Sequence, residues 1–209
     1  MHANAHRPFE CLSFENCMKT IFSFASAALA VCLSLVAPVS VAQVPAKAAM
    51  CIGCHGENGN SSMPNTPSLA GQNARYIYLQ LRDFQEGRRH NDMMSPMTAG
   101  LSKADMQELA TYFSEQKLTN KRFKADPDKV KKGIAKADET LCAMCHLGEF
   151  KGQNEIPKVA GQNFDYVVKT LKDFKAKDRN NDAGNMTSVA STLSEEDIDN
   201  LAHYIASLN

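Results

Sequence analysis

Two short segments of the sequence share one chemical pattern, in which two cysteines separated by two residues are followed at once by histidine. The residues of this pattern are Cys51, Cys54, His55, Cys142, Cys145 and His146. Thiols at this spacing lie one helical turn apart, so each can add to a vinyl group of one haem, and the adjacent histidine is carried under the iron. The doubled pattern therefore predicts two covalently bound haem c groups.

Three other interpretations of these cysteines compete with haem. A Cys-x-x-Cys pair can be half of a zinc site, but the chain should then offer a matching second pair for each metal. A redox dithiol does not need the histidine. Two disulfides would suit an exported protein, but they do not explain why histidine follows both pairs.

The first 42 residues are typical of a secretory signal peptide. An uncharged apolar run at residues 21–37 follows Lys19, and the small residues before position 43 predict cleavage after Ala42. The protein could equally begin at Met18. A retained transmembrane helix is the alternative, because about 20 apolar residues can span a bilayer. We expect an exported, periplasmic protein that associates with the membrane only if this segment is retained.

Most of the remaining chain is an internal repeat. The segment PSLAGQN at residues 67–73 returns as PKVAGQN at residues 157–163, an offset of 90. Apolar residues in both copies recur at helical spacing, with no alternating strand pattern. The sequence therefore predicts an all-α fold of two tandem domains. The expected bounds are 43–118 for the first domain, 119–127 for a polar linker and 128–209 for the second domain.

The repeat also selects candidates for the second axial ligand of each iron. Met94 and Met186 each lie seven residues before the Leu-Ser pair that opens the last helix of their half. A ligand that both halves require should recur in both, which favours these two methionines over residues that do not recur. The non-recurring rivals are Met93, Met97, His90 and His203. Packing against the porphyrin is the other role open to Met94, which we expect in a loop that crosses the first haem.

Two arginines also recur in the repeat. Arg89 and Arg179 stand at an offset of 90, each just before an Asn-Asp pair. We expect them to lie near a haem propionate or at the interface between the two domains. The alternative is a solvated surface position, since both halves are rich in charge here and surface ion pairs contribute little to stability.

The chain resembles the diheme class I cytochromes c of the cytochrome c4 group. The resemblance covers about residues 45–209 and rests on the two Cys-x-x-Cys-His motifs, the repeated Ala-Gly-Gln-Asn segments and the methionine spacing. It implies two class I cytochrome c folds in tandem, each wrapped around a covalently attached haem. It also implies a periplasmic electron carrier to a terminal oxidase or reductase.

The family pattern gives roles to individual residues of this chain. Cys51, Cys54, Cys142 and Cys145 match the haem attachment sites. His55 with Met94, and His146 with Met186, match the axial pairs. Pro67 and Pro157 match the proline whose carbonyl accepts the hydrogen bond of the histidine Nδ1, although a rigid loop is the simpler role for them.

Methionine in the sixth position raises the reduction potential and leaves no easy place for a substrate. We therefore expect an electron carrier with protein redox partners, such as a membrane quinol-oxidising complex and a terminal oxidase or reductase. The alternatives are a diheme enzyme of the sulfur-compound dehydrogenase or peroxidase type, or a cytochrome subunit of a larger oxidoreductase. The 23 basic and 23 acidic residues give no net charge, which offers no support for nucleic-acid binding.

Overall fold

The computed structural model of the protein describes residues 44–119 and 123–208. The expected signal peptide lies outside the described residues, and so does part of the expected linker, whose bounds stay a prediction. Residues 43–209 belong to one compact unit. Within the described ranges the secondary structure is helical, apart from one isolated bridge between Gln153 and Ile156. The predicted all-α fold is confirmed.

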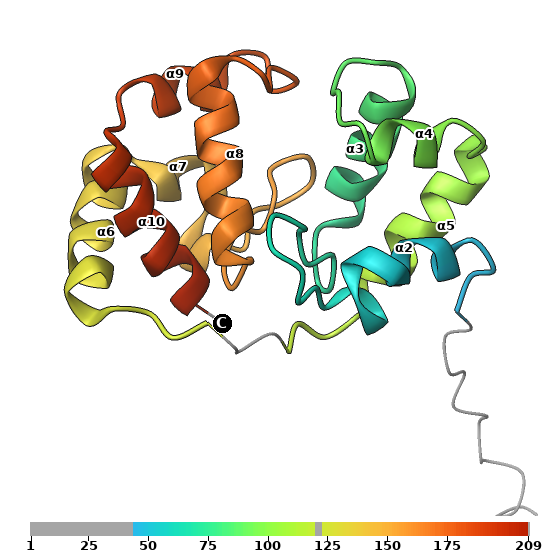
Figure 1. Cartoon of the computed structure of the whole chain (residues 1–209), viewed down its shortest axis with the longest axis horizontal. Coiled ribbons are helices and arrows are strands. Elements are labelled where there is room, and N and C mark those ends of the chain that lie inside the picture. Colours follow the sequence, from blue (N-terminus) through green and yellow to red (C-terminus); the bar gives the residue numbers. More distant parts are fainter. Residues whose placement is uncertain (1–43, 120–122, 209) are drawn as a thin grey trace, which may run out of the picture. The chain divides into compact units, whose positions relative to one another are not determined.

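Short helices build the described part of the first half, residues 44–119 (Figure 1). They are α2 (Ala48–His55), η1 (Glu57–Gly59), α3 (Ala74–Gln85), α4 (Met94–Thr98) and α5 (Lys103–Ser114). Helix α3 packs against both α4 and α5. Helix α4 occupies part of the segment that we expected to be a loop; Pro96 is tolerated there because it lies in the first turn, where the backbone N–H has no partner within the helix.

The second half repeats this order and adds one long helix at its start. Its elements are α6 (Pro127–Glu139), α7 (Cys142–His146), η2 (Gly148–Phe150), α8 (Phe164–Ala176), α9 (Asn185–Ser191) and α10 (Glu195–Ser207). Helix α10 packs against α6 and α8, and α9 packs against α8. None of the helices in the described ranges is long and apolar enough to cross a membrane.

Each half has its own hydrophobic core, formed by the apolar faces of the helices that correspond in the repeat. In the first half the largest contributions come from α3 and α5, with Ile77, Leu81, Leu109 and Phe113 buried. In the second half they come from α8 and α10, with Val167, Leu171, Leu201 and Ile205 buried. Small cores of this size leave a domain marginal on its own, so a haem that adds apolar surface contributes to stability.

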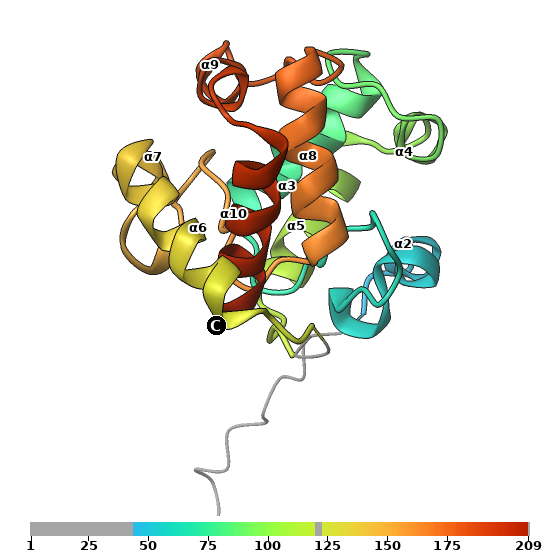
Figure 2. The ribbon, with the colours of Figure 1, turned by 60° about the vertical axis from the view of Figure 1, so that its left-hand side comes forward.

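Helices α6 and α10 lie side by side (Figure 2), and one glycine of α6 lies at their closest approach. A Cβ on Gly133 would lie 2.2 Å from the Asn200 carbonyl oxygen and 2.8 Å from the Tyr204 Cβ. The helices can therefore approach this closely only because residue 133 has no side chain. In the last helix the two halves align at an offset of 92, as Ser102 and Ser194 do, so Glu108 corresponds to Asn200. Glu108 is exposed, and the first described helix of its half starts only at Ala48.

Hydrogen bonds from both arginines of the repeat join the two halves. Arg179 Nη2 donates to the Tyr76 hydroxyl at 3.0 Å, and Arg89 Nη2 donates to the Tyr166 hydroxyl at 3.0 Å. Arg179 is only 7% exposed. Of the positions expected for these arginines, the domain interface is confirmed, and the solvated surface is wrong.

Candidate haem sites

The four cysteines of the two motifs lie on short helices, as the haem interpretation requires. Cys51 and Cys54 belong to α2, and Cys142 and Cys145 belong to α7. In both pairs the first cysteine is half-buried and the second is exposed, and none forms a disulfide in the described part of the chain. Burial raises the pKa of the Cys51 thiol. Residues three apart share one face of a helix, so both thiols of a pair could bond to the same haem.

Both histidines of the motifs are buried and are oriented by a hydrogen bond. His55 Nδ1 lies 2.8 Å from the Pro67 carbonyl oxygen, and His146 Nδ1 lies 2.9 Å from the Pro157 carbonyl oxygen. A carbonyl can only accept, so the proton is on Nδ1 and Nε2 keeps a free lone pair for a metal. Burial lowers the pKa of both histidines, although the carbonyl contacts raise it, so burial favours the neutral ring.

A loop that turns sharply after each histidine brings the proline back to it. In the first half Gly56 has φ +79°, and a Cβ there would lie 2.1 Å from the Asn60 carbonyl oxygen. Leu147 follows His146 in the second half and adopts a similar left-handed φ of 60°. Further along, Leu69 and Ala70 both donate their backbone N–H groups to the Gly59 carbonyl, which closes the loop of the first half.

The methionines favoured by the repeat border the same cores as the cysteine motifs. Met94 and Cys51 both pack against the core of the first half, and Met186 and Cys142 both pack against that of the second half. Met93 is 69% exposed and Met97 is 36% exposed. This equivalence supports the choice of Met94 and Met186 that the repeat predicts.

The rival histidines have other partners. His90 is exposed, and its ring contacts the Asp92 carboxylate at 3.1 Å. His203 Nδ1 accepts a hydrogen bond from the Asp126 backbone at 3.0 Å, and its ring packs on Phe123 and Phe164. His203 therefore holds the start of α6 against α10, a structural role that does not involve the haem motifs.

The donor set in each half fits haem c. It consists of two thiols on one helix face, one buried imidazole with a free Nε2, and one half-buried thioether, the combination found in cytochromes c. Two large apolar side chains at the second motif are exposed: Leu141, just before it, at 59%, and Met144, within it, at 71%. Among the described residues no cluster of His, Cys, Asp and Glu could hold a metal ion instead.

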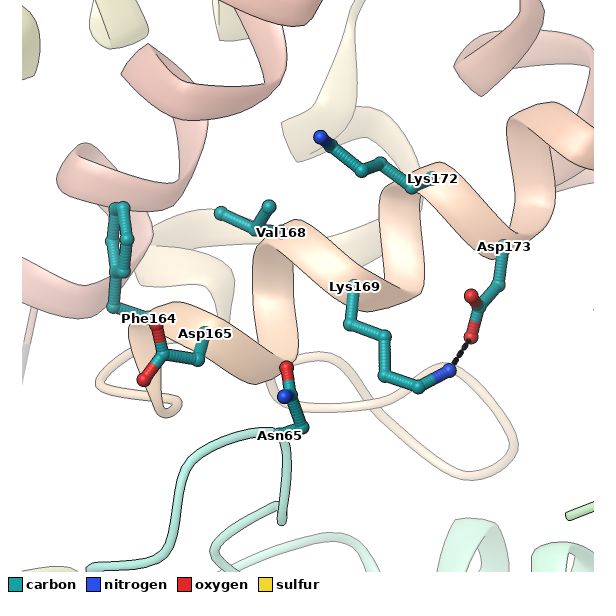
Figure 3. Close-up of a pocket in the computed structure, with 7 residues that line it drawn as sticks. All are labelled: Asn65, Phe164, Asp165, Val168, Lys169, Lys172 and Asp173. Carbon is teal, nitrogen blue, oxygen red and sulfur yellow. Dashed lines mark hydrogen bonds and ion pairs between the residues drawn. The ribbon is translucent and has the colours of Figure 1, made fainter.

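A separate surface cavity of about 330 Å³ lies along α8 (Figure 3). It is lined by Asn65, Phe164, Asp165, Val168, Lys169, Lys172 and Asp173. Lys169 and Asp173 form an ion pair at its edge. None of the predicted haem residues lines this cavity, so it is not part of the candidate haem sites.

The structure also shows contacting residues that the sequence analysis did not single out. Gln72 and Gln162 each form hydrogen bonds with the opposite half, and Tyr76 and Tyr166 accept from the arginines. All four recur at an offset of 90, so the repeat did contain the signal. The repeat did not indicate, however, that these four residues contact the opposite half and not their own half.

Two tandem all-α domains, each with a Cys-x-x-Cys-His motif on a short helix, define a diheme c-type cytochrome. The chain belongs to the cytochrome c family, whose sequence profile matches residues 43–117 and 130–209. This finding confirms the family resemblance, the tandem cytochrome c fold and the two haem c cofactors.

Named relatives agree with this assignment. Cytochrome c4 of Pseudomonas aeruginosa is 38% identical, covering 78% of this chain and 86% of that protein. The "thiosulfate dehydrogenase electron acceptor" of Thiomonas intermedia is 34% identical, covering 81% and 83%. The crystal structure of reduced cytochrome c4 from Pseudomonas stutzeri has a TM-score of 0.73 at 37% identity, covering 78% of this chain and 95% of that one. The chain is thus similar over most of its length to diheme electron-transfer proteins.

Proposed function

We propose that this protein is a periplasmic electron carrier that passes electrons between respiratory proteins by outer-sphere transfer. In this proposal the axial pairs are His55 with Met94 and His146 with Met186. The observation that carries it is the equivalence of the two halves: each has a buried histidine held by a proline carbonyl and a half-buried methionine on the same core as the cysteine motif.

Haem, when bound, supplies a one-electron couple at each site. His55 with Met94, and His146 with Met186, would hold the two haems, and the carbonyl groups of Pro67 and Pro157 fix the histidine rings. An enzyme that acts on thiosulfate or peroxide needs an open or exchangeable position on one iron, and would therefore differ between its two halves. The halves of this chain present the same donors, which favours the carrier.

We propose a membrane quinol-oxidising complex as electron donor and a terminal oxidase or reductase as acceptor. A second candidate donor is a sulfur-compound dehydrogenase. It is favoured by the likeness to the Thiomonas intermedia protein, which is named as the electron acceptor of thiosulfate dehydrogenase. In both cases the protein itself carries electrons and transforms no substrate.

A reconstitution experiment tests this function. The purified holoprotein is mixed in turn with quinol and quinol-oxidising membranes, with thiosulfate and a thiosulfate dehydrogenase, and with thiosulfate or peroxide alone, while haem absorbance is followed. We expect rapid reduction in one of the first two mixtures and re-oxidation by a terminal oxidase. Turnover of thiosulfate or peroxide by the protein alone would contradict the carrier and support the enzyme.

A further inference from the structure

Two glutamines at equivalent positions of the repeat each bind the backbone of the opposite half. Gln72 accepts from the Lys158 N–H at 2.8 Å and donates to the Lys158 carbonyl at 2.7 Å. Gln162 accepts from the Ser68 N–H at 2.8 Å and donates to the Ser68 carbonyl at 3.0 Å. Each side-chain amide thus pairs with one residue through both of its polar atoms.

The two residues that receive these glutamines directly follow the prolines that hold the histidines. The peptide group between Pro67 and Ser68 therefore has two partners: its C=O accepts from His55 at 2.8 Å, and its N–H donates to Gln162 at 2.8 Å. The peptide group between residues 157 and 158 is held in the same way, by His146 at 2.9 Å and by Gln72 at 2.8 Å. One planar peptide group thus links each histidine to the other half.

A peptide group transmits polarisation because its C=O and N–H share one delocalised electron system. An acceptor on the N–H increases the negative charge on the oxygen, and linked hydrogen bonds strengthen each other by about 10–30% per bond. A stronger acceptor at Nδ1 makes the imidazole a better electron donor through Nε2, and such contacts tune a bound metal. An electron-rich ligand favours the oxidised iron and lowers the potential.

Both glutamines are held in place for this contact. Gln72 is 7% exposed, and its Oε1 also accepts from the Asn73 backbone at 2.9 Å. The Oε1 of Gln162 likewise accepts from the Asn163 backbone at 2.8 Å. The amide orientation is therefore set from both sides, with the oxygen toward the peptide N–H.

We propose that each glutamine is a positioning residue for the haem of the other half: Gln162 lowers the potential of the haem bound by His55, and Gln72 lowers that of the haem bound by His146. The inference rests on the proposed axial roles of the two histidines. Its distinctive consequence is a crossed pattern, because a substitution in one half acts on the iron of the other half.

The test compares Gln162→Met and Gln72→Met in the full-length holoprotein. Methionine keeps the length of glutamine, but it has no N–H donor and its sulfur is only a weak acceptor. Redox titration gives the two potentials, and NMR of ¹⁵N-histidine in the reduced protein gives the Nδ1–H resonances. Gln162→Met should raise the potential of the His55 haem and move its Nδ1–H resonance upfield, leaving His146 unchanged. Gln72→Met should raise the potential of the His146 haem and move the His146 Nδ1–H resonance upfield, leaving His55 unchanged. Each should change the electron-exchange equilibrium between the haems by about two- to tenfold, in opposite directions.

Two further variants separate this effect from a loosened interface. Gln162→Glu keeps an acceptor oxygen, so the His55 haem should stay at or below the wild-type potential. Asn163→Ala removes the 3.0 Å bond to the Met63 carbonyl, another contact between the halves, without touching the Pro67 peptide group. A shift in the haem of the substituted half, equal shifts in both haems, or the same shift from Asn163→Ala would overturn the proposal. If Gln162→Met does not fold, a raised potential in Gln162→Glu would overturn it too.

The wild-type spectrum distinguishes this failure from a failure of the ligand assignment. In the oxidised protein an axial histidine shows large paramagnetic shifts of its ring protons. If His55 and His146 both show these shifts but the crossed pattern is missing, the glutamine inference alone is wrong. If the shifts are missing, the proposed axial roles of His55 and His146 are wrong, and so is the glutamine inference that rests on them.

Discussion

The Tyr76 hydroxyl lies 3.0 Å from Nη2 of Arg179, and the equivalent pair of Tyr166 and Arg89 has the same distance. Each arginine also lies over a phenylalanine ring of its own half. The distance from Cζ to the ring centroid is 4.5 Å both for Arg179 over Phe174 and for Arg89 over Phe84. The repeat therefore uses one contact twice, in opposite directions. Charged donors in such partly desolvated positions make strong hydrogen bonds.

This arrangement predicts an unusual titration of Tyr166. Desolvation raises the pKa of Tyr166, but the charges of Arg89 and Arg179 lower it more, to about 7. The folded pKa is thus below the ordinary value, so the stabilisation from the phenolate is complete above about pH 10 and is lost as the pH falls towards 7. In ¹³C-tyrosine NMR, Tyr166 should titrate near neutral pH, and Arg89→Gln should raise its midpoint. Tyr204, whose pKa burial raises, is the internal control. A Tyr166 midpoint near 10 would contradict this.

The glycine at the crossing of α6 and α10 predicts a stability effect. In Gly133→Ala the new Cβ would overlap the Asn200 carbonyl, so the helices must separate at a cost of about 1–3 kcal/mol. Lys131→Ala, at an exposed position of α6, should change stability by less than about 0.5 kcal/mol. Denaturant unfolding of both holoproteins measures the difference. Equal stabilities would show that the helices do not pack this closely.

Which features of this protein can be predicted from the sequence depends on how far apart in the chain the contributing residues lie. The roles of Cys51, Cys54 and His55 follow from a local motif, and Met94 follows from comparison of the two halves. The hydrogen bond between Gln162 and Ser68 spans 94 residues and joins an ordinary polar side chain to a backbone N–H group. No local propensity marks such a pair, because its geometry arises only when the two halves pack together.

The proposed axial role of Met94 predicts a spectroscopic difference between neighbouring methionines. Met94→Ala should remove the long-wavelength sulfur-to-iron band of one haem, lower its potential and allow external ligands to bind. Met97→Ala should leave the spectrum intact, because Met97 is 36% exposed and does not recur in the second half. Loss of the band in Met97→Ala and its retention in Met94→Ala would show that the register inferred from the repeat is wrong for the first half.

Export and haem attachment together predict the mass of the mature protein. Cleavage after Ala42 leaves residues 43–209 with four cysteines, all in the two haem motifs. The intact mass of the mature protein should equal this polypeptide plus two haems. A single added haem would show that one motif is not used. A mass that includes residues 1–42 would show that the apolar segment is retained.

The central claim, that both irons carry two protein ligands and serve only electron transfer, is tested most directly by carbon monoxide binding to the reduced holoprotein. Carbon monoxide binds ferrous haem only where an axial position is open or its ligand exchanges. We predict an unchanged spectrum at neutral pH, together with sulfur-to-iron bands from both haems in the oxidised protein. Stoichiometric binding of carbon monoxide to one haem would contradict the account, because it would show that this iron has an open or exchangeable axial position.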